Sequence, residues 1–391
     1  MRWDNLRLAG DGTGDQALPL FARGAITRTF DTPEFRGITF YEIHARSIIN
    51  RVPGASRVPF EWTINPYRGC SHACVYCFAR KTHEYLDLDA GRDFDSKIVV
   101  KVNAPDLVRR ELAAPKWTGA PIAMGTNVDC YQRAEGRYRL MPGIIAALRD
   151  AANPFSILTK GSLILRDLDL LVEASQVTEV STAVSAGFLD DDAWRAVEPG
   201  TPNPRKRLEV CATLNEHGVR CGVLMAPILP YLTDSPALLS ATVRRIAEAG
   251  AVHVTPIVLH LRPGAREWFM AWLSREHPRL VPRYLELYGR GAYAPKAYQE
   301  RIGRQVAELA RQHGVGRATP REARRIRPPD TPQHPSEQWP QPASEPVSAR
   351  GPERAQERAS EHTPDQRYAH RSGRPAAETR RPPAPEQLTL L

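Results

Sequence analysis

Three cysteines lie within eight residues of one another in the stretch NPYRGCSHACVYCFAR, which runs from Asn65 to Arg80. Their spacing is Cys70-x3-Cys74-x2-Cys77. Thiolates at this spacing on a curled loop can reach three corners of a cuboidal iron–sulfur cluster, and a [4Fe–4S] cluster takes four ligands. The sequence therefore predicts a [4Fe–4S] cluster held by these three cysteines, with one iron open to another ligand.

The competing interpretation is a structural zinc site with His72 as the fourth ligand. His72 is only two residues from both Cys70 and Cys74, which is tight for a tetrahedral site. Structural zinc sites also usually take their ligands from two separated pairs, and the other three cysteines of the chain are isolated. Zinc would make the protein a non-catalytic, metal-stabilised nucleic-acid-binding protein.

The cysteine motif, with Tyr76 directly before the last cysteine, resembles the signature of the radical S-adenosylmethionine (radical SAM) superfamily. The wider context INPYRGCSHACVYCFAR resembles the proteins related to spore photoproduct lyase, and the resemblance covers roughly Gly37 to Tyr288. It implies that the open iron binds the amino and carboxylate groups of SAM. It also implies that an electron from the cluster cleaves SAM to methionine and a 5′-deoxyadenosyl radical, which takes hydrogen from the substrate.

The resemblance implies a SAM site at the ends of the predicted strands. Its expected members are Tyr76 beside the last cysteine, Thr126, Asn127 and Asp129 toward the amino group, Lys160 toward the carboxylate, Ser185 toward the ribose or methionine, and the backbone of Ile228 toward the adenine. From the residues alone, a Gly-Thr-Asn turn is an equal alternative for the second group. A surface lysine is the alternative for Lys160, although a lysine that leaves an apolar strand into a cleft is costly unless it is paired.

Cys130 is a candidate hydrogen donor to the product radical. The resemblance places such a cysteine at the end of the second strand, where this chain has Gly125, and Cys130 follows five residues later. A buried small hydrophobic residue is the alternative role for Cys130.

These residues need a scaffold that brings strand ends together. Strand-like apolar runs occur at Glu61–Ile64, Ile122–Gly125, Phe155–Thr159, Glu179–Ser185, Cys221–Ile228 and Val252–Leu259. Helix-like segments separate the later ones, at Leu165–Ser175, Asn203–Gly218 and Ser235–Gly250. The alternation predicts an α/β fold with a parallel sheet, and six units fit an open (β/α)6 barrel, which is also the fold that the resemblance implies.

The active face of such a fold is at the C-terminal ends of its strands, and the cysteines follow the first strand. Arg205, Lys206 and Arg207 begin the predicted helix at Asn203 and are expected at this face, where they could meet an anionic substrate. A further apolar run, Lys97–Val102, predicts an extra strand without a defined place in the barrel.

Four regions are expected along the chain. These are an N-terminal extension packing on the barrel (1–56), the partial barrel (57–290), a helical segment (291–326) and a disordered tail rich in proline (327–391). No apolar run approaches the ~18 residues of a membrane span. The start of the chain also lacks the apolar segment of a secretory signal. We therefore expect a cytoplasmic protein without a membrane partner, in which thiols stay reduced and clustered cysteines bind metal.

The excess positive charge lies outside the tail. The net charge is +9, and residues Pro328 to Leu391 contain eight arginines, no lysine and nine acidic residues, which leaves +10 for the rest. Such an excess is expected for a polyanionic partner such as nucleic acid. The expected function is a radical SAM enzyme acting on nucleic acid, in the manner of a DNA-lesion lyase, with an electron donor such as flavodoxin or ferredoxin. The alternative is a peptide or small-molecule substrate.

The chain ends in EQLTLL after a long polar tail. The pentapeptide from Gln387 to Leu391 resembles the bacterial sliding-clamp-binding pattern QLxLF, with leucine at the position of the phenylalanine. A chance group of leucines is the alternative.

A peptide covering Pro385 to Leu391 is expected to bind the sliding clamp with micromolar-scale affinity. Each leucine buried in a pocket contributes about 1.5–3 kcal/mol before ordering costs are subtracted. Gln387→Ala or Leu390→Ala should abolish binding in a fluorescence anisotropy titration. Absence of saturable binding up to about 1 mM, equivalent to only about 4 kcal/mol, would contradict the motif.

Overall fold

The structure is a computed structural model, and it describes residues 25–52 and 58–316 of the 391. The tail predicted at 327–391, including its QLTLL end, lies outside the described residues. The boundaries proposed for the other three regions stay predictions.

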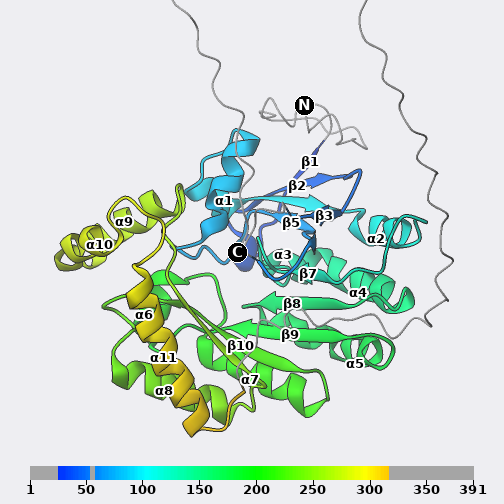
Figure 1. Cartoon of the computed structure of the whole chain (residues 1–391). Helices are drawn as coiled ribbons and strands as arrows, with labels where there is room; N and C mark the ends of the chain where they lie inside the picture. Colours follow the sequence, from blue (N-terminus) through cyan, green and yellow to red (C-terminus); the bar gives the residue numbers. More distant parts are fainter. Residues whose placement is uncertain (1–24, 53–57, 317–391) are drawn as a thin grey trace, which may run out of the picture. The chain divides into compact units, whose positions relative to one another are not determined.

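The main sheet has seven strands in the order β11-β10-β9-β8-β7-β4-β3. They are β3 (Ile49–Arg51), β4 (Trp62–Ile64), β7 (Ile122–Met124), β8 (Phe155–Thr159), β9 (Val180–Ser185), β10 (Cys221–Ile228) and β11 (Val254–Val258). The six strands from β4 to β11 are parallel, and each pairs with its neighbour in sequence order within this sheet, whereas β3 is antiparallel to β4 (Figure 1). All six predicted strands are therefore present, and the α/β fold with an open, partial (β/α)6 barrel is confirmed.

Helices follow most of these strands. They are α1 (Arg92–Ser96), α2 (Ala104–Leu112), α3 (Arg133–Tyr138), α4 (Leu140–Asp150), α5 (Leu168–Val177), α6 (Asp191–Val197), α7 (Pro204–Glu216), α8 (Pro236–Glu248), α9 (Ala265–Glu276), α10 (Val281–Tyr288) and α11 (Lys296–Gln312). Short 3₁₀ helices are η1 (Pro33–Phe35), η2 (Phe78–Leu86), η3 (Ser162–Asp167) and η4 (Pro278–Leu280). The predicted starts of α7 and α8 are confirmed, because Asn203 and Ser235 cap them through their side chains. The helix predicted from Leu165 begins instead as η3 and continues as α5.

A second sheet gives the extra strand its place. Its order is β1-β2-β6-β5, with β1 (Ile26–Thr29), β2 (Thr39–Ile43), β6 (Lys97–Lys101) and β5 (Tyr67–Arg68). The run that starts at Lys97 is β6, which is parallel to β2 and antiparallel to β5. Since β5 ends two residues before Cys70, this second sheet holds the entry to the cysteine loop.

The core follows the periodicities of its elements. Along β8, buried residues alternate with half-buried ones, as expected for a strand with two different faces. Helix α4 buries Ile144 and Leu148, which are one turn apart, in the same core cluster as Ile157 of β8. Each such side chain contributes about 1.5–3 kcal/mol when fully buried.

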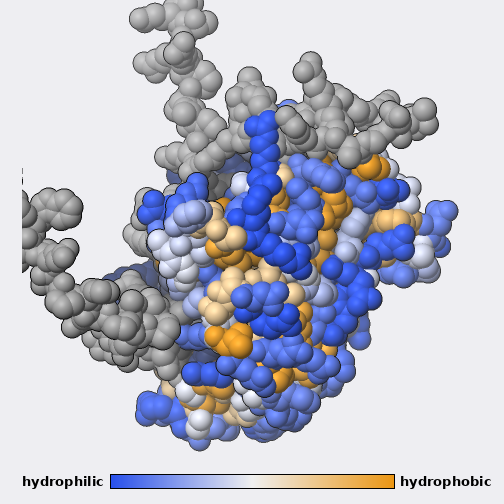
Figure 2. All heavy atoms as spheres, turned by 90° about the vertical axis from the view of Figure 1, so that its right-hand side faces the viewer, coloured by the Kyte–Doolittle hydropathy of each residue, from blue (hydrophilic) through white to orange (hydrophobic). Residues whose placement is uncertain are grey.

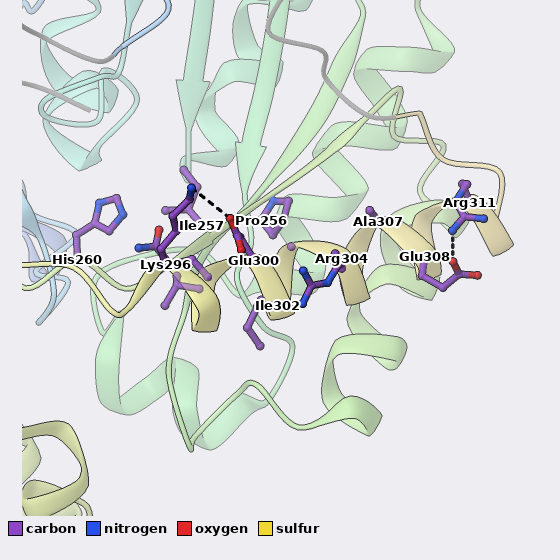
Figure 3. A pocket seen from close by; sticks show the side chains of 13 residues that line it. Pro256, Ile257, His260, Lys296, Glu300, Ile302, Arg304, Ala307, Glu308 and Arg311 are labelled. Carbon is purple, nitrogen blue, oxygen red and sulfur yellow. Dashed lines mark hydrogen bonds and ion pairs between the residues drawn. The ribbon is translucent and has the colours of Figure 1, made fainter. Parts of the chain in front are cut away.

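The open edge of the barrel at β11 is protected from pairing. The amide of Val254 donates to the carbonyl of Gly316 (N···O 3.1 Å), and Pro256 has no N–H to offer. Helix α11 lies against β11 and α8 (Figure 1). The groove between β11 and α11 has a volume of about 820 Å³, and two ion pairs of α11, Lys296–Glu300 and Glu308–Arg311, are among the residues that line it (Figure 3).

The face of the molecule in Figure 2 is mainly hydrophilic, with hydrophobic residues in separate groups, as is usual for a folded domain. Within 25–52 and 58–316, none of the helices combines the length and the apolar content that crossing a membrane requires.

Gly125, directly after β7, is a test of the fold at the active face. Its φ is +76°, and an added Cβ would lie 1.8 Å from the carbonyl oxygen of Leu158. Gly125→Ala should therefore lower the free energy of unfolding by at least about 3 kcal/mol, the sum of a left-handed backbone and overpacking. Gly119→Ala is the matched control, because its φ is +70° but its added Cβ would meet nothing within 4 Å. Gly119→Ala should lower the free energy of unfolding by only about 1–2 kcal/mol. Urea titration of both variants measures the two losses, and equal losses would contradict the steric argument.

Candidate metal centre and cofactor site

The three cysteines of the motif lie on the loop between β5 and η2. Successive turns curl this loop, with the amides of Ala73 and Cys77 donating to the carbonyls of Cys70 and Cys74 (3.2 Å each). Ala73 has φ +54°, which reverses the chain between the first two cysteines. Cys70 and Cys74 are buried, Cys77 is half-buried, and none of the three is in a disulfide.

The environment of the thiols suits a metal rather than free thiolates. Burial raises the pKa of all three thiols, and that of Cys74 to about 12, with the charge of Glu198 as the second cause for Cys74. A bound metal reverses this effect because it coordinates the deprotonated sulfur. The buried loop therefore keeps its thiols protonated until metal binds.

Arg80 is fully buried beneath the same loop. Its guanidinium donates to the carbonyl of Cys74 (2.9 Å), to the carbonyl of Gly91 (2.7 Å) and to the carboxylate of Asp95 (2.9 Å). The ring of Trp268 stacks on it at 4.9 Å. Arg80 thus fixes the backbone of the cysteine loop and places a positive charge near the thiols.

The structure does not support His72 as a zinc ligand. His72 is buried, and its Nδ1 lies 3.4 Å from Oδ2 of Asp129. Three thiols spread along one loop fit a cluster with separate corner irons better than one zinc ion.

Lys160 directly follows β8, and its ammonium lies among polar side chains. The side chain is 16% exposed, and its Nζ donates to Oγ of Ser185 at 2.8 Å. Nζ also lies 4.0 Å from the carboxylate of Glu198 and 5.8 Å from the ring centroid of Tyr76. The interpretation of Lys160 as an exposed surface lysine is therefore wrong, and three residues from different elements hold its charge inside the protein.

Glu198 is the centre of this group. Its carboxylate accepts hydrogen bonds from the hydroxyl of Tyr76 and from the guanidinium of Arg207, and both ion-pair partners are at most 1% exposed. Burial alone would raise the pKa of Glu198, but the charges of Arg207 and Lys160 lower it below its ordinary value. With one carboxylate, one guanidinium and one ammonium, the group carries one excess positive charge.

Arg207 corrects a prediction. It was expected, with Arg205 and Lys206, to meet an anionic substrate, but its guanidinium is buried and bonded to Glu198, to Oγ1 of Thr201 (2.7 Å) and to a backbone carbonyl of β9. Lys206 is exposed and pairs with Glu209 of the same helix at 2.8 Å. Arg205 is exposed, and its proposed contact with substrate stays a prediction.

The loop that carries Glu198 packs directly on the cysteine loop. The amide of Gly200 donates to the carbonyl of His72 (3.0 Å), and that of Val75 donates to the carbonyl of Val197 (3.0 Å). A Cβ on Gly200 would lie 2.2 Å from the carbonyl oxygen of Ser71, so only glycine permits this approach. Two loops from opposite parts of the barrel therefore meet at the cysteines.

Unpaired acceptor oxygens follow the neighbouring strands β4 and β7. Oδ1 of Asn65, Oγ1 of Thr126 and Oδ1 of Asn127 are buried without a hydrogen-bond partner among the described residues. Parallel strands bring their C-terminal ends to one edge, so these three side chains belong to the same side of the sheet. Buried polar atoms without a partner are costly, which indicates that a ligand with donor groups completes them.

Asp129 differs from its two neighbours. Its carboxylate accepts from the backbone amides of Tyr131 (2.9 Å) and Lys160 (2.6 Å), from the hydroxyl of Thr159 (2.6 Å) and from His72. Burial alone would raise the pKa of Asp129, but the charge of His72 and these hydrogen bonds lower it to about 2. These contacts fix Asp129 between neighbouring loops of the site, and its contact with SAM stays a prediction.

The other predicted residues occupy more ordinary surroundings. Oγ of Ser185 accepts from Lys160 and donates to the carbonyl of Ala226 (2.9 Å). The carbonyl of Ile228 already accepts from the amide of Leu259 (3.0 Å). Their contacts with SAM, like that of Tyr76, stay predictions.

Cys130 is completely buried, and burial raises the pKa of its thiol. It therefore keeps its hydrogen, as a hydrogen donor must, although a packing role requires the same. No side chain could stand at Gly125, because a Cβ there would meet the carbonyl of Leu158. The donor role of Cys130 stays a prediction.

The residues present fit the two expected cofactors. The cysteine loop offers three buried thiols to the cluster. Lys160 offers a partly neutralised ammonium to a carboxylate, and the oxygens of Asn65, Thr126 and Asn127 offer acceptors to an ammonium. Asn65 and Glu198 were not predicted as site residues. The only signal for Asn65 in the sequence was its place directly after a strand, and the only signal for Glu198 was its place directly before Pro199 and Gly200.

Comparisons of the sequence agree with this site. The family model for the radical SAM superfamily matches residues 64–240. An uncharacterized protein of Mycobacterium tuberculosis is 51% identical over 311 residues, which are 79% of this chain and 92% of that protein. An uncharacterized protein of Methanocaldococcus jannaschii is 31% identical over 207 residues, 52% of this chain and 73% of that protein.

Solved structures of spore photoproduct lyase have a similar fold. The lyase complexed with dinucleoside spore photoproduct has a TM-score of 0.51 and 16% identity, and the match covers 70% of this chain and 79% of that one. A mutant of the lyase with bound AdoMet and the same dinucleoside has a TM-score of 0.51 and 16% identity, covering 67% and 76%. At this identity the likeness concerns the fold alone.

Replacing any of Cys70, Cys74 and Cys77 by Ala should remove a cluster ligand. Iron bound after anaerobic reconstitution should fall well below the about four atoms of a full cluster, and SAM cleavage should stop. Cys211→Ala and Cys221→Ala are the matched controls, since both residues are buried cysteines elsewhere in the barrel and should keep the iron. A Cys74→Ala protein with a full [4Fe–4S] cluster and SAM cleavage would overturn the assignment.

Replacing Lys160 by Ala should weaken SAM binding by about 1–3 kcal/mol, the range for a hydrogen bond between charged groups. Iron content should stay unchanged, because Lys160 is not a cluster ligand. Calorimetric titration of the reconstituted protein with SAM measures the loss, and Lys116→Ala, which removes an exposed lysine, serves as control. Equal SAM affinity in the two variants would exclude Lys160 from the carboxylate site.

Proposed function

Because the chain belongs to the radical SAM superfamily, whose members use a [4Fe–4S] cluster and SAM, we propose that it is a radical SAM enzyme that acts on nucleic acid. The observation that carries the radical SAM part is the buried three-cysteine loop at the C-terminal ends of the parallel strands. Lys160 and the unpaired oxygens beside that loop match the two ends of an amino acid, which is the part of SAM that such a site must hold.

When bound, the two cofactors supply a reducing electron and the sulfonium bond that it cleaves. The residues of this chain hold and orient them. Cys70, Cys74 and Cys77 hold three corners of the cluster, and Lys160 orients the carboxylate of SAM while Thr126 and Asn127 receive its ammonium. The buried loops around the cysteines exclude water from the reacting centre.

The nucleic-acid part rests on charge and on fold-level analogy. The +10 charge outside the tail favours a polyanionic substrate. The structurally similar lyase has been solved with a dinucleoside, so this fold can hold such a ligand. Within this proposal the reaction is that of a DNA-lesion lyase, an external donor such as flavodoxin or ferredoxin supplies the electron, and the QLTLL end recruits the enzyme to the sliding clamp.

Formation of 5′-deoxyadenosine tests both parts. The reconstituted, reduced protein should show the broad absorption near about 400 nm of an iron–sulfur cluster, and it should cleave SAM faster in the presence of DNA that contains lesions. Mass spectrometry of the DNA should reveal a matching change. Absence of any SAM cleavage would contradict the enzyme class. Cleavage that DNA and RNA leave unchanged would instead favour a peptide or small-molecule substrate.

A further inference from the structure

A cleft of about 630 Å³ opens beside the cysteine loop. Its floor includes His72 of that loop, Gly161 directly after Lys160, and Gly200 of the loop that carries Glu198. Gly161 and Gly200 pack against the backbones of Tyr131 and Ser71, with no space for a Cβ at either position. The cleft is therefore built from the same tightly packed loops that form the cofactor site, and a ligand in it would lie next to that site.

Two arginines of α3 lie on the rim of this cleft. Arg133 and Arg137 are exposed and are four residues apart, so both project from one face of the helix. The guanidinium of Arg137 lies 4.7 Å from the ring centroid of Phe30, which also lines the cleft. This cation–π contact holds the charge of Arg137 at the lining of the cleft.

These arginines lack the carboxylate partners that neighbouring ones have. Arg149 pairs with Asp150 and Glu173, and Arg166 pairs with Glu135 and Asp167. By contrast, no carboxylate of a described residue lies within 4.0 Å of a nitrogen of Arg133 or Arg137, although Glu34 lines the same cleft.

Two like charges one helical turn apart destabilise a helix slightly unless an anion neutralises them. The groove between β11 and α11 is different, because Lys296 and Arg311 there are paired with Glu300 and Glu308 (Figure 3). Among the described residues, the groove holds one arginine without a carboxylate partner, Arg304, whereas the cleft at the cysteine loop holds two such arginines on one helix face.

We infer that Arg133 and Arg137 bind two neighbouring backbone phosphates of a nucleic-acid substrate, one each, and that Phe30 positions Arg137 for this contact. This inference rests on the proposed function, since it assigns the part of the substrate that lies outside the reacting centre. Planar guanidinium groups suit phosphate oxygens because they donate two parallel hydrogen bonds. The cleft of about 630 Å³ has the volume of a site for a small ligand, which is enough for one nucleotide.

The test is oligonucleotide binding by the full-length, reconstituted protein as a function of salt. A fluorescently labelled oligonucleotide is titrated between 50 and 200 mM KCl, a range in which phosphate contacts lose much of their affinity (roughly tenfold or more for several contacts). Arg133→Ala/Arg137→Ala should bind about 10- to 100-fold more weakly, and the slope of log K against log salt should fall by about 2, one for each lost contact. Phe30→Leu should weaken binding about 2- to 5-fold, whereas Phe30→Tyr, which keeps a ring under Arg137, should restore it.

Arg290→Ala/Arg304→Ala is the matched control. It removes two exposed arginines, one of which lines the groove at α11, and it should leave the salt slope within about 0.5 of the wild type, a quarter of the change expected for two lost contacts. SAM affinity and iron content should be equal in all variants, which excludes loss of folding as the cause. Inorganic phosphate and a phosphopeptide, added as competitors, identify other sources of the same anion.

The outcomes separate the inference from the proposed function. If the wild type binds DNA but the α3 variant keeps its affinity and slope, or the control loses as much, the assignment of the cleft is overturned and the nucleic-acid proposal stands. Displacement of the oligonucleotide by phosphopeptide at equal concentration would also overturn it. If the wild type shows no salt-dependent binding to DNA or RNA, the proposed substrate itself is contradicted.

Discussion

The arrangement of the site depends on the buried ion pair between Glu198 and Arg207. Both side chains are at most 1% exposed, so removal of either partner would leave an uncompensated buried charge, at a cost of about 3–5 kcal/mol. The pair joins three parts of the chain. Glu198 also accepts from Tyr76 of the cysteine loop, and Arg207 of α7 also donates to the carbonyl of Ser185 at the end of β9. The position of the cysteines relative to Lys160 follows from these contacts.

Charge explains why this centre is ready for its cofactors. Lys160 adds a positive charge to the neutral Glu198–Arg207 pair, and Arg80 adds another beneath the cysteine loop, partly balanced by Asp95. Each buried cation costs free energy in the absence of an anion. A cluster held by three thiolates and the carboxylate of SAM are both anionic. Their binding therefore neutralises positive charges that are already buried in the folded protein. In the same way, an ammonium group would supply hydrogen-bond donors to the unpaired oxygens of Thr126 and Asn127.

Local patterns in the sequence were enough to predict the barrel but not the contacts between its loops. Each of the six parallel strands is a short apolar run that is visible in the sequence itself. The helix caps at Asn203 and Ser235 can be identified from neighbouring residues in the same way. The place of β6 was not predictable, because it depends on pairing with β2, whose residue Thr39 lies opposite Lys97. Arg207 was placed wrongly for a similar reason. A run of three basic residues is typical of a solvated helix start. The burial of the last of them depends on Glu198, nine residues earlier, and on the carbonyl of Ser185 at the end of β9.

The central claim is that three protein thiolates hold a [4Fe–4S] cluster and leave one iron open to SAM. Electron paramagnetic resonance of the reduced, reconstituted protein, recorded with and without SAM, tests it most directly. The account predicts a [4Fe–4S] signal whose g values shift when SAM is added, because SAM becomes a ligand of the open iron, and a much smaller shift in the Lys160→Ala protein at the same SAM concentration. A full [4Fe–4S] signal that saturating SAM leaves unchanged would contradict the account.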